Sequence, residues 1–394
     1  MTSSEFNINN FINSTVSSMQ PSGIRKFFDI VNTMEDAISL GVGEPDFITP
    51  WHIRDAGVYS LEKGQTYYTS NSGLLELREE ICKYVQKYDL NYSPDEVLVT
   101  VGGSEAIDLT MRTVISPGDE VIIPEPSFVC YKPCVALAGG IPVTIQTKAE
   151  NEFKLTPQEL IEKITPKTKL LVLSYPNNPT GAIMEKKDLE KIADVVKKYN
   201  IMVLSDEIYS ELTYKGKHTS IASLPNMKER TIVVNGFSKS FAMTGWRLGY
   251  VMAHPTLTKQ LTKVHQYAIM SSPTTSQYAA IEALKNGNEA VKMMVSEYND
   301  RRKIITDAFN KMGFPCFSPL GAFYIFPSIK SSGLKSEEFC EKLLMEEKVA
   351  LVPGTAFGES GEGFVRVSYA YSIKQITKAL ERIQKFAKGL AKDK

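Results

Sequence analysis

The middle of the chain alternates short apolar runs with amphipathic segments, and this alternation limits the fold more than any other feature. Runs rich in Val, Ile and Leu predict strands at residues 97–101, 120–123, 169–173, 201–204 and 231–234. Helical periodicity predicts helices between them, at residues 104–114, 127–138 and 186–199. This strand–helix rhythm predicts an α/β fold with a mostly parallel sheet between helices.

Local signals support individual boundaries within this pattern. Thr156 to Glu159 (TPQE) forms a capping box with proline at the first helical position. In the segment 186–199, the residues Leu189, Ile192, Ala193 and Val196 share one face of a helix, and Asn200 is placed to end it. We therefore expect this helix to pack on the sheet.

The last hundred residues have a different character. Long helices are predicted at 289–312, 336–347 and 372–387, with short strands at 322–325 and 364–367. This order indicates a smaller α+β unit. Residues 1 to about 40 carry too little apolar periodicity for a core of their own, so we expect them to pack onto one of the larger units.

Composition excludes several classes of function. The 394 residues include 45 basic and 45 acidic side chains, and this balance argues against binding to nucleic acid or to an anionic membrane surface. No apolar run approaches the ~18 residues of a membrane span. The five cysteines are scattered and the N-terminus has no signal-peptide pattern. We expect a cytoplasmic enzyme without a metal site, since Cys130 and Cys134 have no histidine pair beside them.

Two segments after predicted strands carry candidate catalytic groups. Lys239 lies in NGFSKSFAMTGWRLGY (235–250) among apolar side chains, which favour its neutral, nucleophilic form. Asp206 ends another strand, at the edge where open α/β folds keep their sites. Because strand side chains alternate, only one of Asp206 and Glu207 can share a site with Lys239. Taken singly, Lys239 could be a solvated lysine and Asp206 a helix cap.

Two further segments complete a ligand hypothesis. Gly103 and Ser104 lie between a strand and a helix start, where backbone amides favour a phosphate, although the pattern is not that of a dinucleotide or nucleotide loop. Asn178 follows the strand at 169–173, and Arg247 lies near Lys239 in sequence. Together these groups suit a phosphorylated pyridine aldehyde that condenses with the lysine while the aspartate holds the ring nitrogen protonated.

With these motifs in family order, the sequence resembles the class I/II pyridoxal-phosphate aminotransferases of the aspartate aminotransferase fold, fold type I. The resemblance runs from GEPDFITP (43–50) to GEGFVRVSYA (361–370), through NPTG (178–181), SDEIY (205–209) and SKSFAMTGWRLGY (238–250). It implies a large cofactor-binding domain with a mostly parallel, seven-stranded sheet, and a smaller α+β domain built from both chain ends. The implied division is 1–42 for the N-terminal arm and part of the small domain, 43–285 for the large domain and 286–394 for the small domain.

The resemblance also implies a role for each matching position. Lys239 corresponds to the lysine that binds pyridoxal 5'-phosphate and moves the proton, and Asp206 to the partner of the ring nitrogen. The other implied cofactor contacts are Tyr209 and Asn178 at the phenolic oxygen, Phe128 stacked on the ring, and Gly103, Ser104, Ser238 and Arg247 at the phosphate. Arg366 would grip the substrate carboxylate, with Gly43 and Asn178 beside it. Tyr68 would reach the phosphate of the neighbouring subunit, so a homodimer with shared sites is implied.

Specificity is less constrained. Gly236 replaces a serine found three residues before the lysine in many relatives, and Ser104 replaces a lysine found in aspartate-specific bacterial members. PSGIRKFFDI (21–30) resembles the aromatic or broad-specificity branch. The expected reaction is ping-pong transfer of an amino group from an aromatic, acidic or broader range of L-amino acids to a 2-oxo acid such as 2-oxoglutarate. A C–S β-lyase on the same fold and a non-catalytic cofactor-binding relative are the alternatives.

Overall fold

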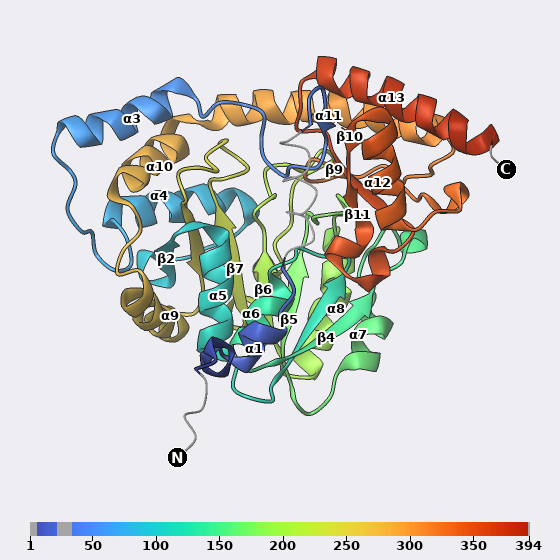
Figure 1. The fold of residues 1–394 in the computed structure, drawn as a ribbon. Coiled ribbons are helices and arrows are strands. Elements are labelled where there is room, and N and C mark those ends of the chain that lie inside the picture. Colours follow the sequence, from blue (N-terminus) through green and yellow to red (C-terminus); the bar gives the residue numbers. More distant parts are fainter. Residues whose placement is uncertain (1–5, 22–33, 393–394) are drawn as a thin grey trace.

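The computed structural model describes residues 6–21 and 34–392, and a seven-stranded sheet forms its centre (Figure 1). The strand order is β2-β8-β7-β6-β5-β3-β4. The strands are β2 (Val97–Thr100), β3 (Glu120–Glu125), β4 (Ile141–Gln146), β5 (Thr168–Ser174), β6 (Met202–Asp206), β7 (Thr231–Gly236) and β8 (Gly249–Met252). The α/β class and the mostly parallel sheet predicted from the sequence are confirmed.

The pairing within the sheet brings three strand ends together. Strands β3, β5, β6 and β7 pair in parallel, and β8 pairs antiparallel with both β7 and β2. In this register Ser174, Asp206 and Val234 lie side by side across β5, β6 and β7. The turns that follow these strands therefore open at one edge of the sheet, where the candidate residues of the sequence also lie.

Helices cover both faces of the sheet. One face packs against α5 (Gly102–Val114), α6 (Tyr131–Leu137) and α9 (Pro255–Ala268). The opposite face packs against α7 (Pro157–Lys163) and α8 (Lys186–Lys198), and further along against α4 (Leu75–Val85) and α10 (Thr274–Asn286). Helix α3 (Trp51–Glu62) lies against α10. Burial on both faces explains why the strand segments are almost wholly apolar.

The C-terminal residues form a second group of elements beside the strand ends (Figure 1). Its helices are α11 (Asn288–Lys311), α12 (Ser336–Glu347) and α13 (Ile373–Lys392). A small sheet joins β11 (Val352–Pro353), β12 (Val365–Ser368) and β9 (Tyr324–Ile325), and β1 (Ile38–Ser39) pairs with β10 (Val349–Ala350). A segment close to the N-terminus thus lies within the C-terminal group. The domain boundaries expected at 42/43 and 285/286 stay a prediction.

Several local predictions can be compared directly with the structure. The capping box forms, since Thr156 Oγ accepts a hydrogen bond from Glu159 N and the Glu159 carboxylate accepts one from Thr156 N. Asn200 takes a φ of 51°, which lets the chain turn after α8. The helix predicted at 127–138 begins only at Tyr131, because Ser127 N donates to Phe357 O and holds the preceding segment away. Strands β4 and β8 were not predicted.

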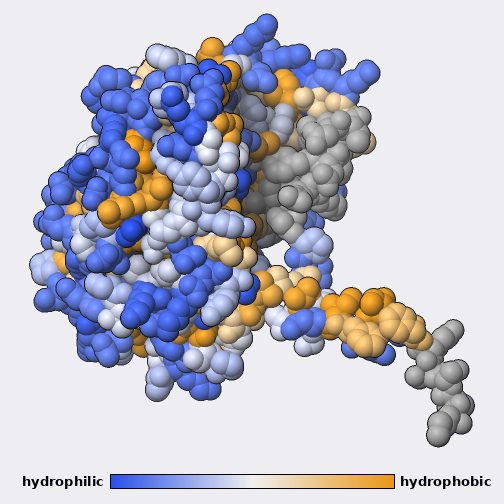
Figure 2. Space-filling model, turned by 90° about the vertical axis from the view of Figure 1, so that its left-hand side faces the viewer, coloured by the Kyte–Doolittle hydropathy of each residue, from blue (hydrophilic) through white to orange (hydrophobic). Residues whose placement is uncertain are grey.

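The short helix α1 (Ser14–Ser18) belongs to an N-terminal segment that projects from the body of the molecule (Figure 2). Its side chains are exposed, including Phe6, Ile8, Phe11, Ile12 and Val16. Most of the PSGIRKFFDI segment, residues 22–30, lies outside the described residues. Throughout the described ranges, every helix is too short or too polar to cross a membrane.

Candidate active site

A cavity of about 270 Å³ lies at the ends of β5, β6 and β7, between the large sheet and β12. Its lining includes every site residue expected from the sequence except Tyr68: Gly43, Gly103, Ser104, Phe128, Asn178, Asp206, Tyr209, Ser238, Lys239, Arg247 and Arg366. The sequence places these residues in seven separate segments. Their convergence follows from the parallel sheet, which brings the turns after its strands to one edge.

Lys239 lies three residues beyond the end of β7 and is largely surrounded by protein. Its Nζ donates a hydrogen bond to Gly43 O at 2.7 Å, and the Phe323 ring lies 6.0 Å away. Burial lowers the pKa of this ammonium from 10.5 to about 8, although the negative charge of Glu44 opposes the shift. The amine is therefore far more readily neutral, and nucleophilic, than that of an exposed lysine.

Asp206 is the last residue of β6, and 5% of its surface is exposed. Tyr131 Oη donates a 2.6 Å hydrogen bond to Asp206 Oδ2, and Ile208 N donates to Oδ1 at 3.2 Å. Burial raises the pKa of the carboxyl group, while these two hydrogen bonds lower it. Glu207 points elsewhere and does not line the cavity, so the alternation expected from the strand is confirmed.

Small residues and one arginine form a recess at the start of α5. Gly102 takes a φ of 77°, and a Cβ there would lie 2.8 Å from Arg247 Nη2. A Cβ on Gly249 would lie 2.6 Å from the Gly102 carbonyl carbon. Larger residues would thus close the recess. With Ser104 and Ser238 on its lining, this part of the cavity offers hydroxyl donors, helix-start amides and a guanidinium to an anion.

Arg366 provides a second guanidinium to the lining of the cavity, and 2% of its surface is exposed. Its Nη1 donates to Asn178 Oδ1 at 2.8 Å and its Nη2 to Gly41 O at 2.5 Å. Its Nε is buried without a hydrogen-bond partner, and the Tyr324 ring lies 4.5 Å from its Cζ. A buried guanidinium with an unused donor is suited to bind a carboxylate.

Comparison with known proteins identifies the family. The sequence model of the family described as "Aminotransferase class I and II" matches residues 35–383. The chain belongs to the class I and II aminotransferases. It is 48% identical to an aspartate aminotransferase of Pyrococcus abyssi (strain GE5 / Orsay), over 93% of this chain and 96% of that protein.

Two further relatives of this aminotransferase carry a different substrate in their names. Aromatic-amino-acid aminotransferase 2 of Thermococcus litoralis is 46% identical over 94% of this chain and 96% of its own. The crystal structure of an aromatic aminotransferase from Pyrococcus horikoshii OT3 superposes with a TM-score of 0.88 at 46% identity, covering 92% of this chain and 99% of that one. The resemblance to the family and its fold is confirmed, and the protein is an enzyme.

The aminotransferases of this family use pyridoxal phosphate, and the cavity contains groups that fit it. The recess beside Arg247 suits a phosphate, and the buried Asp206 suits a protonated ring nitrogen. The depressed pKa of Lys239 suits an amine that must attack an aldehyde. The volume of about 270 Å³ also matches a small ring with two polar ends rather than a macromolecule.

Sequence reasoning missed several residues of the aminotransferase cavity. Tyr131 bonds to Asp206, and Tyr324 shares a 2.8 Å hydrogen bond with Tyr209 through their hydroxyl groups. The remaining unpredicted lining residues are Ile107, Ser174, Ile208 and Thr244. Tyr131 immediately follows the PEPSFVC segment and Tyr324 lies in a predicted strand, but neither position indicates which cavity the side chain enters.

Tyr68 lies outside the cavity, and 77% of its surface is exposed. Its expected contact is with the phosphate of a second subunit, and a single chain does not test this. The role of Tyr68 therefore stays a prediction.

Proposed function

We propose that this aminotransferase transfers the amino group of an L-amino acid to a 2-oxo acid such as 2-oxoglutarate, with pyridoxal 5'-phosphate held in the cavity at the strand ends. One observation carries the proposal. A lysine whose pKa is lowered to about 8 shares a single cavity with a buried aspartate and a buried arginine that has a free donor. These are the amine, the ring partner and the carboxylate clamp that the reaction requires.

The lining residues divide into three groups by the part of the cofactor they would hold. The phosphate would bind to Gly103, Ser104, Ser238 and Arg247, and also to Tyr68 of a second chain. The ring would stack on Phe128, with Asp206 at its nitrogen and with Asn178 and Tyr209 at its phenolic oxygen. When bound, pyridoxal phosphate supplies a carbonyl carbon that accepts the amino group and a ring that takes up electrons as the substrate α-proton leaves.

The protein's own groups then perform the proton transfer. Arg366 binds the α-carboxylate, with Gly43 and Asn178 beside it, and this contact orients the α-hydrogen toward Lys239. The neutral Lys239 amine removes the proton from the α-carbon, and returns a proton there in the reverse half-reaction. Since Arg366 binds the carboxylate of both substrates, the 2-oxo product must leave before the 2-oxo acceptor binds. This order gives ping-pong kinetics.

An aromatic, acidic or broader range of donors is supported by the names of the relatives, which include aspartate and aromatic aminotransferases. Among the described residues that line the cavity, the cations are Lys239, Arg247 and Arg366, and each has a role already. Ser104 stands where bacterial aspartate-specific members of the family often carry lysine. We therefore favour donors with apolar or aromatic side chains within this range.

A donor panel tests the proposal. Full-length enzyme loaded with pyridoxal phosphate is mixed with single L-amino acids and 2-oxoglutarate, while glutamate formation and the visible cofactor band are followed. Phenylalanine, tyrosine or aspartate should yield glutamate and shift the band. A band that no amino acid shifts would refute the proposal. Ammonia and pyruvate from a cysteine conjugate, without glutamate from any donor, would instead favour the β-lyase.

We further propose a homodimer with shared sites. Exposed apolar side chains support it, because several lie on α3 and on the segments that flank it, one of which carries Tyr68: Ile48, Trp51, Val58, Tyr59, Leu61 and Tyr67. The N-terminal segment also exposes apolar side chains (Figure 2).

Subunit mixing tests this arrangement. If Tyr68 acts across the interface, the inactive Lys239→Ala chain and a Tyr68→Ala chain should form hybrids with one intact site, and activity should rise on mixing. No rise, with hybrids demonstrated by mass, would contradict shared sites. A cytoplasmic location is supported by the unpaired state of all five cysteines, and cell fractionation would test it.

A further inference from the structure

Directly after Asp206, the chain buries a second carboxylate that the proposed reaction does not use. Glu207 is 1% exposed and does not line the active-site cavity. Its Oε1 accepts hydrogen bonds from Ser205 Oγ at 2.8 Å and Ser220 Oγ at 2.6 Å, and its Oε2 lies 2.9 Å from His218 Nε2. A buried carboxylate is costly unless it is bonded in this way. The three partners therefore fix the position of the Glu207 carboxylate.

Glu207 belongs to the turn of residues 206–210, which also carries Asp206 and Tyr209, two proposed cofactor contacts. Glu207 N donates to Val234 O on β7 at 2.8 Å, and Glu207 O accepts from Ser210 N at 2.9 Å. Ser210 Oγ accepts in turn from Asn235 Nδ2 at 3.1 Å. Asp206 precedes Glu207 and Tyr209 follows it by two residues. The bonds of the Glu207 carboxylate and of its backbone therefore act on the same short turn, from which both cavity side chains project.

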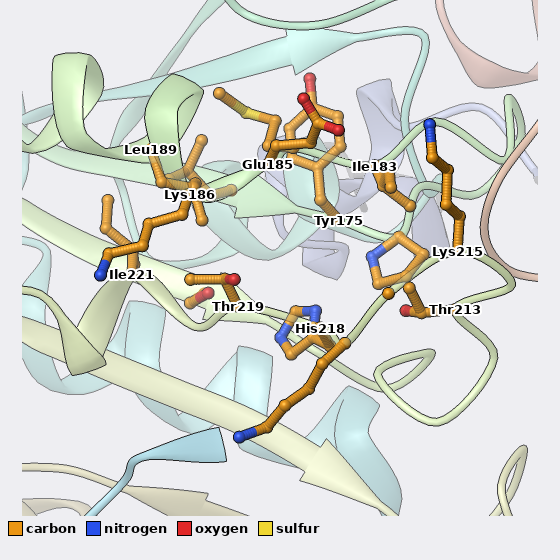
Figure 3. Close-up of a pocket in the computed structure, with 16 residues that line it drawn as sticks. Tyr175, Ile183, Glu185, Lys186, Leu189, Thr213, Lys215, His218, Thr219 and Ile221 are labelled. Carbon is orange, nitrogen blue, oxygen red and sulfur yellow. The ribbon is translucent and has the colours of Figure 1, made fainter.

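His218, the histidine partner of Glu207, lines a second cavity of about 180 Å³. Figure 3 shows the His218 ring on its wall, facing Thr219 and Ile221, while the ammonium ends of Lys186 and Lys215 point away. The ring of Tyr88 packs edge-on against His218 at 5.4 Å. Because His218 lines this cavity, the cavity gives small molecules a route to the imidazole.

We propose that Glu207 and His218 are positioning residues: their buried pair, fixed by Ser205 and Ser220, holds the 206–210 turn so that Asp206 and Tyr209 meet the cofactor. This inference rests on the cofactor roles proposed above for those two residues. Neither Glu207 nor His218 touches the cavity in which the reaction would occur.

Glu207 could affect Asp206 through its negative charge or through its effect on the position of the turn, and these two explanations predict opposite results for Glu207→Gln. Burial, and to a smaller degree the Glu207 charge, raises the pKa of Asp206. If charge alone mattered, Glu207→Gln would help Asp206 stay ionised and would strengthen cofactor binding. If position matters, the weaker bond between His218 and an amide loosens the turn and weakens cofactor binding. The direction of the change therefore decides between the two.

The experiment measures the dissociation constant of pyridoxal 5'-phosphate for the cofactor-free, full-length chain, by titration of the visible band, together with kcat and KM. Glu207→Gln and His218→Ala should each weaken binding by about tenfold to a hundredfold, the range for a lost hydrogen bond to a buried charge. Ser220→Ala removes one neutral donor and should cost about threefold to tenfold. His52→Ala is the matched control. His52 also pairs with a glutamate, since its Nδ1 lies 2.8 Å from Glu282 Oε1, but neither residue lines the cavity. This substitution should change cofactor binding by less than about twofold.

Adding free imidazole to His218→Ala distinguishes a positioning role of His218 from a general loss of stability in that variant. The cavity beside residue 218 can admit free imidazole into the space vacated in His218→Ala. Imidazole should restore cofactor affinity and kcat in that variant, and leave wild type and Glu207→Gln unchanged.

Wild-type affinity in Glu207→Gln, His218→Ala and Ser220→Ala would overturn the inference. Tighter binding in Glu207→Gln, or a loss in His218→Ala that imidazole does not reverse, would also overturn it. Failure of the proposed function has a different signature, because wild type itself would then form no borohydride-reducible link at Lys239.

Discussion

Lys239 should react with an aldehyde at a pH well below that needed by an ordinary lysine. Only the neutral amine attacks a carbonyl carbon, and burial lowers the pKa of this amine from 10.5 to about 8. At pH 7 such a group is neutral in about one molecule in eleven, compared with about one in three thousand at the ordinary pKa. The neutral fraction is thus raised roughly 300-fold.

The assay mixes the full-length, cofactor-free chain with pyridoxal phosphate from pH 6 to 10.5 and traps the product with borohydride. Mass spectrometry of the digest then quantifies modification at each lysine. The initial rate at Lys239 should rise about tenfold per pH unit and level off near pH 8. Lys83 is an internal control, because its hydrogen bond to Glu80 raises its pKa and its labelling should still increase above pH 10.

Removal of a nearby charge gives the same reasoning a second test. Glu44 raises the pKa of Lys239 against the larger effect of burial. Glu44→Gln should therefore move the midpoint of the Lys239 profile below that of wild type. Glu289→Gln is the control, because Glu289 is exposed on α11 and pairs with Lys292. A wild-type midpoint above pH 10, or an upward shift in Glu44→Gln, would refute the assignment.

Four other substitutions test the cavity. Asp206→Ala should fold, yet lower kcat at least about a hundredfold, because the ring nitrogen loses its charged partner; near-normal turnover would contradict the role. Tyr131→Phe removes the 2.6 Å bond to Asp206 and should cost about tenfold in kcat/KM, with an unchanged value counting against it. Arg366→Lys should raise KM for amino donors about tenfold to a hundredfold, more than it lowers kcat. Lys239→Ala should bind pyridoxal phosphate but form no reducible link.

The strands buried on both faces could be predicted from sequence because their apolar runs are nearly continuous, as at 169–173. Strand β4 was missed because its exposed and half-buried residues give no such run. Strand β8 was missed because it lies within the Lys239 motif and pairs antiparallel, outside the strand–helix rhythm. The late start of α6 depends on the contact of Ser127 with Phe357, which is remote in sequence.

Some residues of the candidate site could likewise be predicted from the sequence, and others could not. Lys239 and Asp206 could be proposed because each lies at or just after a predicted strand, and Arg366 could be proposed because of the resemblance to the family. Tyr131 and Tyr324 could not, because a tyrosine in a helix or a strand gives no sign that it faces a cavity. Their roles follow only from the contacts with Asp206 and Tyr209.

By itself, the sequence determined the class of fold and the chemical groups available, since periodicity and residue type are properties of short segments. Tertiary structure decided which groups meet, how far burial lowers the pKa of Lys239, and which of two adjacent carboxylates enters the cavity. The physical reason is that desolvation and hydrogen bonding depend on neighbours brought from distant segments. Asp206 and Glu207 illustrate this, because they are adjacent in the chain and yet Asp206 lines the cavity while Glu207 does not.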